Sequence, residues 1–99
     1  MSKFQRTLAT KVVTTAGIAE PLVVSSQGFV ELVIQAKTSN TGSVFIGSSL
    51  VTSTVGLELV QGASKDYNLP GDLKDISIDV ETSGDGVILE YVASGSFRK

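Results

Sequence analysis

The stretch that decides the fold of this chain runs from Phe29 to Gly47, with the sequence FVELVIQAKTSNTGSVFIG. Apolar and polar residues alternate along its first half, which is typical of a strand buried on one face only. The segment Ser39-Asn40-Thr41-Gly42 contains Asn and Gly, which adopt positive φ at the lowest cost. The short apolar run Val44-Phe45-Ile46 follows at once. These features predict a β-hairpin of two paired strands.

The rest of the chain repeats this pattern of short strands and turns. Six further strands are predicted, over residues 4–15, 22–24, 57–59, 64–69, 75–82 and 87–92. The segment 75–82 alternates most regularly, and its polar residues Ser77, Asp79 and Glu81 are expected to face solvent. The segment 87–92 is apolar on both faces, so we expect the core to cover one face and a neighbouring subunit the other.

The last two strands are separated by Ser83-Gly84-Asp85-Gly86. Because Asp-Gly and Asn-Gly suit the same hairpin turns, this segment predicts a second hairpin in which Asn could replace Asp85.

About eight short strands without a helical stripe predict an all-β fold, an antiparallel β-sandwich of jelly-roll type. We expect one domain over residues 1–99, with a short basic N-terminal arm (about 1–6) and a polar C-terminal tail (about 93–99). The expected core consists of Leu8, Val12, Leu22, Val24, Val30, Leu32, Ile34, Val44, Ile46, Leu57, Leu59, Leu69, Ile76, Ile78, Val80, Val87, Leu89 and Tyr91.

Composition excludes several classes of protein. The 99 residues contain no Cys, so disulfide frameworks, thiolate nucleophiles and Cys metal sites are absent. No apolar run approaches the length of a membrane-spanning helix, and the polar start of the sequence does not resemble a secretory signal. Five of the eight positive charges lie near the chain ends, so these ends either are solvated or dock on an acidic surface. No basic stripe with stacking aromatics indicates nucleic-acid binding.

The search for catalytic chemistry is mostly negative. The absence of His removes the commonest general base and, together with the absence of Cys, the usual catalytic triads and zinc sites. Asp79 and Glu81 project from one strand face about 7 Å apart, but their expected solvated position does not favour a glycosidase. We therefore predict neither an enzyme nor a cofactor.

Two binding alternatives remain open. Asp72, Asp75 and Asp85 lie in or beside turns and could contribute to a calcium site, although Asp in a turn commonly bonds its own backbone. Aromatic side chains could also form a sugar-binding platform, but more often they are core or interface anchors. Six residues are of this type: Phe4, Phe29, Phe45, Tyr67, Tyr91 and Phe97.

Several segments together resemble the small virion proteins of tailed bacteriophages. In those proteins an Asn-Thr-Gly hairpin ends at a Gly, and is followed by an x-Leu-x-x-Gly turn and an Asp-Leu-x-Asp-Ile strand. The corresponding segments here are Val33–Ala36, Asn40–Gly47, Gly56–Leu59, Gly62, Leu69–Ile76 and Gly84–Val87. The resemblance extends over most of the chain, from about Lys11 to Val92, and consists of turns and strands rather than active-site residues.

This resemblance implies a structural protein without enzymatic activity, often trimeric, that decorates or cements the capsid. It would be made in the host cytoplasm, bind the major capsid protein and its own copies at the virion surface, and contact neither nucleic acid nor membrane. The alternative is a tail, neck or fibre protein that binds a receptor or glycan. The candidate interface residues are Lys3, Phe4, Arg6, Lys11, Ile88, Val92, Phe97 and Arg98.

Overall fold

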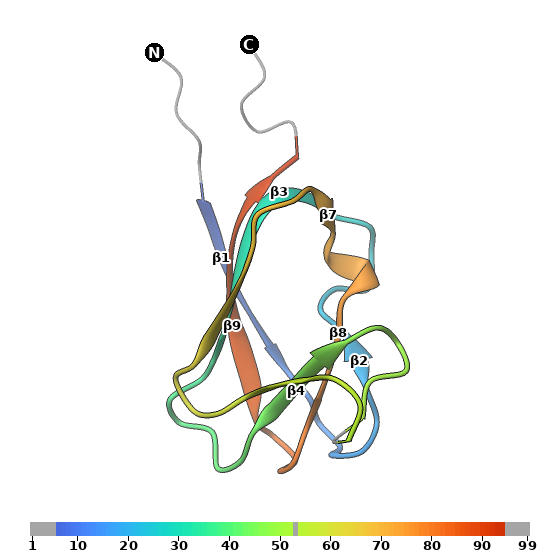
Figure 1. Cartoon of the computed structure of the whole chain (residues 1–99), viewed down its shortest axis with the longest axis vertical. Helices are drawn as coiled ribbons and strands as arrows, with labels where there is room; N and C mark the ends of the chain where they lie inside the picture. Colours follow the sequence, from blue (N-terminus) through green and yellow to red (C-terminus); the bar gives the residue numbers. More distant parts are fainter. Residues whose placement is uncertain (1–5, 53, 95–99) are drawn as a thin grey trace.

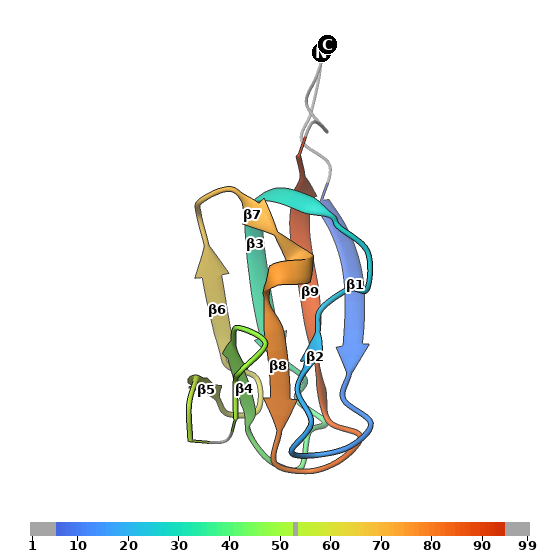
Figure 2. The ribbon, with the colours of Figure 1, turned by 90° about the vertical axis from the view of Figure 1, so that its right-hand side faces the viewer.

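The computed structural model describes residues 6–52 and 54–94, which form two antiparallel sheets packed face to face (Figures 1 and 2). The five-stranded sheet has the order β1 (Arg6–Val12), β9 (Gly86–Ala93), β3 (Gly28–Ala36), β6 (Ser64–Tyr67), with β7 (Gly71–Asp72) also paired to β3. The four-stranded sheet has the order β2 (Glu20–Pro21), β8 (Ser77–Val80), β4 (Val44–Gly47), β5 (Leu57–Leu59). One 3-10 helix, η1, spans Leu73–Asp75. The predicted all-β sandwich is confirmed, with nine described strands where about eight were expected.

The core lies between the two sheets and follows the predicted alternation in the central strands. It receives Leu32 and Ile34 from β3 and Leu89 from β9, opposite Ile46 from β4 and Ile78 from β8. Because all of these side chains leave water on folding, their burial between the sheets provides most of the hydrophobic stabilisation.

Four residues of the expected core are exposed instead. Leu8, Val24, Leu57 and Leu69 have exposed fractions of 70%, 83%, 46% and 78%. Leu8 lies on the outer side of its sheet, because the neighbouring Ala9 packs on the core. Leu57 lies on the edge strand β5, and Val24 and Leu69 lie outside the strands. Four other expected core residues are only half-buried: Val12, Val30, Ile76 and Tyr91.

The predicted hairpin over 29–47 is wrong, because its two strands belong to different sheets. β3 pairs with β9, β6 and β7, whereas β4 pairs with β8 and β5. The connection between them crosses from one sheet to the other, and Asn40 in this connection is buried. Positive φ is not needed here, since the described residues with positive φ are Gly17, Gly56, Gly62 and Gly84.

The predicted Asp-Gly hairpin is wrong for the same reason: β8 and β9 lie in different sheets.

The β3–β4 connection and the β8–β9 connection meet at one end of the sandwich. Asn40 donates from Nδ2 to the Gly86 carbonyl (2.9 Å) and accepts from the Gly86 N–H (3.0 Å). The carboxylate of Asp85 accepts the N–H groups of Thr41 and Gly42. We call these five residues the crossover junction.

Some element boundaries also differ from the predictions. The strand expected at 22–24 is instead β2 at Glu20–Pro21, and the strand expected at 75–82 is shortened to β8 by η1. Arg6 and Ala93 belong to β1 and β9 rather than to the predicted arm and tail. β1 begins and β9 ends at the end of the sandwich opposite the crossover junction (Figure 1).

Candidate functional site

The outer face of the five-stranded sheet carries three of the predicted interface residues, Arg6, Ile88 and Val92. The four-stranded sheet covers only the inner face of this sheet (Figure 2). The strand register places alternate residues of three strands on the outer face: Arg6, Leu8, Thr10 and Val12 on β1, Ile88, Glu90 and Val92 on β9, and Glu31, Val33 and Gln35 on β3. We call these residues the outer face.

Apolar and polar residues are mixed on the outer face, since Glu90 lies between Leu8 and Val33, and Ile88 lies between Thr10 and Gln35. Leu8 is largely exposed, while Ile88 and Val33 are half-buried. β9 therefore carries apolar residues on both sides, as predicted from the sequence. Its inner side chains pack in the core, and of its outer apolar side chains Ile88 remains partly exposed.

An ion pair between β1 and β3 lies at one end of the outer face. Arg6 Nη2 lies 2.8 Å from Glu31 Oε1, and both residues are in register with Val92 on the strand between them. The ion pair therefore passes over Val92, which is 1% exposed. Val92 was an interface candidate, but its side chain is already covered within the chain.

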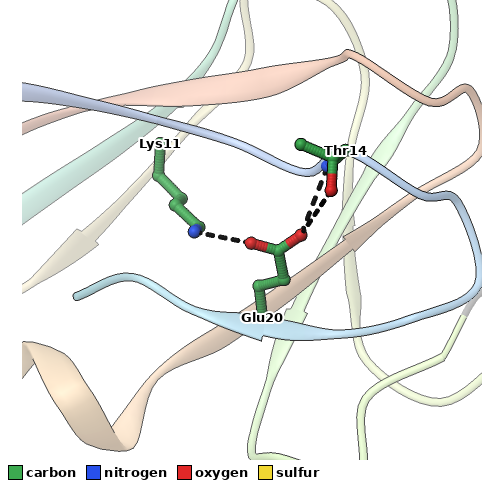
Figure 3. Close-up of polar contacts among 3 residues, drawn as sticks. All are labelled: Lys11, Thr14 and Glu20. Atoms are coloured by element: carbon green, nitrogen blue, oxygen red, sulfur yellow. Dashed lines mark hydrogen bonds and ion pairs between the residues drawn. The ribbon is translucent and has the colours of Figure 1, made fainter. Parts of the chain in front are cut away.

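Lys11 points to the inner side and joins the edges of the two sheets (Figure 3). Its Nζ lies 2.7 Å from Glu20 Oε1, and Glu20 Oε2 accepts the backbone N–H of Thr14 (3.2 Å) and its hydroxyl (3.3 Å). The hydrogen bond from Lys11, followed by that from the Thr14 N–H, lowers the pKa of Glu20. Lys11 is thus engaged inside the chain rather than available to a partner.

Of the remaining interface candidates, Ile88 lies on the outer face, and Lys3, Phe4, Phe97 and Arg98 fall outside the described residues.

The candidate calcium ligands do not converge. Among the described residues there is no group of three or more acidic side chains that could hold a metal ion. Asp72 instead accepts the N–H groups of Gln27 (3.0 Å) and Lys74 (2.9 Å) and the hydroxyl of Ser26. These hydrogen bonds, with that from Ser26 the largest cause, lower its pKa. Asp72 therefore caps η1, as Asp commonly does in a turn.

The aromatic residues do not form an exposed platform in the part of the chain that the structure describes. Phe29 and Phe45 are buried. Tyr67 packs edge-to-face on Phe29 with ring centroids 6.4 Å apart, and Lys65 Nζ lies 5.6 Å from its ring centroid. Burial raises the pKa of Tyr67. Phe29, Phe45 and Tyr67 therefore pack within the protein as core anchors and do not form a sugar-binding platform.

Sequence reasoning missed a small pocket on the outer side of the four-stranded sheet. It has a volume of about 370 Å³ and is lined by Ala16, Gly17, Asp79, Val80 and Glu81, which we call the acidic pocket. Asp79 was expected to face solvent but is 2% exposed. The segment around Gly17 folds over it, and no local signal in the sequence could have indicated that long-range contact.

Comparison with protein-family models, with curated proteins and with solved structures finds no match to this chain. Within the described residues, no helix has the length and apolar character needed to cross a membrane.

Proposed function

We propose that this protein has a structural, non-enzymatic role in which the outer face contacts other protein subunits. The observation that supports it is the exposure of Leu8, a large apolar side chain on the same sheet face as Ile88 and Val33. Burial of these apolar side chains against a partner is favourable by about 25 cal/mol per Å² of apolar surface. A small domain gains stability from burial of this kind that its own core cannot supply.

More specifically, we propose that the protein decorates the head of a tailed bacteriophage, binding between major capsid proteins and self-associating as a trimer. The sequence resemblance supports this assignment, and the outer face is compatible with it. If so, mass spectrometry of purified heads should find the protein in numbers close to those of the major capsid protein. A few copies per particle, or co-purification with tails, would contradict the proposal, and the latter would favour a tail, neck or fibre protein.

The role of the outer face is tested by Leu8→Asp, with Leu69→Asp as the matched control. Both leucines are similarly exposed, but Leu69 does not belong to the outer face. We expect Leu8→Asp to weaken binding to heads lacking the protein by about tenfold or more, as for a central interface residue. Leu69→Asp should bind like the wild type, and both variants should melt like the wild type. Equal binding by the two variants would exclude the outer face as the contact.

We also infer that the sandwich is of the jelly-roll type. Each sheet places an early strand beside a late one, β1 beside β9 and β2 beside β8. This interleaving supports the pair of Greek keys from which a jelly roll is built.

A further inference from the structure

The acidic pocket contains two carboxylates held by backbone donors. Asp79 Oδ1 accepts the N–H groups of Gly17 (2.9 Å) and Val80 (2.8 Å). Glu81 Oε1 accepts the N–H of Ser43 (2.8 Å). In each carboxylate one oxygen is thus fixed in place by the backbone, while among the described residues no hydrogen bond ends on Asp79 Oδ2 or Glu81 Oε2.

The free oxygen of Asp79 faces the pocket. Asp79 is 2% exposed, yet every fully buried side-chain oxygen of the described residues has a hydrogen-bond partner. Its Oδ2 must therefore be reached through the pocket that the residue lines. A carboxylate so nearly removed from water normally has a counter-ion.

No such counter-ion is found in the described part of the chain. The two ion pairs there join Arg6 to Glu31 and Lys11 to Glu20, and neither involves the pocket.

The pocket wall is anchored rather than loose. Ala16 donates its N–H to Ser83 Oγ (2.8 Å), and Gly17 donates to Asp79. Gly17 has φ of 93°, and a Cβ at this position would meet no atom within 4 Å apart from its chain neighbours. A bound group would find these carboxylates already oriented, which lowers the entropic cost of binding.

We propose that the acidic pocket binds a guanidinium or alkylammonium group through Asp79 Oδ2 and Glu81 Oε2. Alternate residues of a strand are about 7 Å apart, so a cation with several N–H donors can lie between the two carboxylates and bond both. Calcium would need six to eight oxygen ligands, which two carboxylates do not supply. This inference does not depend on the proposed virion role, because the pocket and the outer face lie on different sheets.

The test is a titration of the ¹⁵N-labelled chain, followed by the amide signals of Gly17, Val80 and Glu81 at constant ionic strength. Ethylguanidinium and butylammonium should shift these signals saturably, with a dissociation constant of about 1–10 mM. Tetramethylammonium carries the same charge without N–H donors and should not shift them. Absence of saturation, an equal response to tetramethylammonium, or saturable binding of Ca²⁺ would each overturn the proposal.

The matched variants are Asp79→Asn and Glu58→Gln, each of which removes one negative charge from the same sheet. Asn at position 79 retains an oxygen for the Gly17 and Val80 donors, so the fold should persist while the affinity falls about tenfold or more. Glu58 lies on the same side of the sheet but does not line the pocket, so its replacement should leave the affinity within about twofold. If Asp79→Asn does not fold, Glu81→Gln tests the second carboxylate. Equal affinity in the wild type and the folded pocket variant would refute the proposal.

Discussion

Asp79 and Asp85 are both buried, yet they have different partners in the acidic pocket and in the crossover junction. In the junction both oxygens of Asp85 accept backbone N–H groups, from Thr41 at 3.1 and 3.0 Å and from Gly42 at 2.8 Å. In the pocket only Oδ1 of Asp79 does so. A fully bonded carboxylate holds the chain together, whereas one with a free oxygen can also bind a ligand.

The junction also differs from the pocket in its packing. Asn40 and Gly86 exchange two hydrogen bonds, and Gly86 lies against the backbone of β1. Gly17, which lines the pocket, would instead leave a Cβ in open space. Substitutions in the junction should therefore lower the free energy of unfolding, while conservative ones in the pocket should mainly change binding.

The largest effect is expected for Gly86→Ala. A Cβ at this position would lie 2.2 Å from the Lys11 carbonyl oxygen and 2.8 Å from the Val12 Cα, so the backbone of β1 would have to move. We expect a loss of about 3 kcal/mol or more in the free energy of unfolding, measured by urea denaturation.

Gly84→Ala is the control for Gly86→Ala in the same connection. Gly84 has φ of 94° but no atom within 4 Å of a built Cβ, so only backbone strain of about 1–2 kcal/mol is expected. A larger loss at Gly84 than at Gly86 would show that the close approach to β1 is not the main constraint.

A smaller effect is expected for Asp85→Asn. Both carboxylate oxygens of Asp85 now accept the N–H of Thr41. In the variant, the amide NH₂ would face this donor, and the negative charge that strengthens the hydrogen bonds would be lost. We expect a loss of about 1–2 kcal/mol by the same denaturation assay.

Asp79→Asn should change the free energy of unfolding by less than about 0.5 kcal/mol, because one oxygen there accepts both donors. If the two Asn variants were equally stable, the difference between the two aspartates would be refuted.

The sequence predicted strands well but not the pairing between them. Alternation along 30–36 reflects which face of the strand is buried, and this is a local property. Turn residues such as Asn40 and Asp85 indicate only where the chain changes direction. Their side chains bond to segments more than 40 residues away, and these bonds depend on the assembled sandwich.

The candidate site shows the same division. The apolar outer positions of β9 were visible in the sequence, because alternation fails where both faces of a strand are apolar. The acidic pocket was not, since Asp79 alternates like a solvated residue and is covered only by the distant segment around Gly17. Lys11 was assigned to a partner because its charge was visible, whereas its pairing with Glu20 depends on two sheet edges meeting.

A small effect is also expected for Lys11→Gln, where the edges of the two sheets meet. The pKa of Glu20 lies below its ordinary value of 4.5 in the folded chain, mainly because of the hydrogen bond from Lys11. The stabilisation is therefore complete above about pH 4.5 and is lost as the pH falls through the lower, folded-state pKa. At pH 7 we expect the variant to lose less than about 1 kcal/mol in the free energy of unfolding, as for other partly exposed ion pairs.

Urea denaturation of wild type and variant across this pH range should show the two curves converging in acid. The pKa of Asp72 is also lowered, so its protonation at low pH destabilises both proteins equally. This contribution cancels in the difference in unfolding free energy between the wild type and the variant. Lys37→Gln is the control, because within the described residues Lys37 forms no ion pair. A Lys11→Gln deficit that persisted unchanged below the folded pKa of Glu20 would show that Lys11 stabilises the edge through the packing of its alkyl chain rather than through its charge.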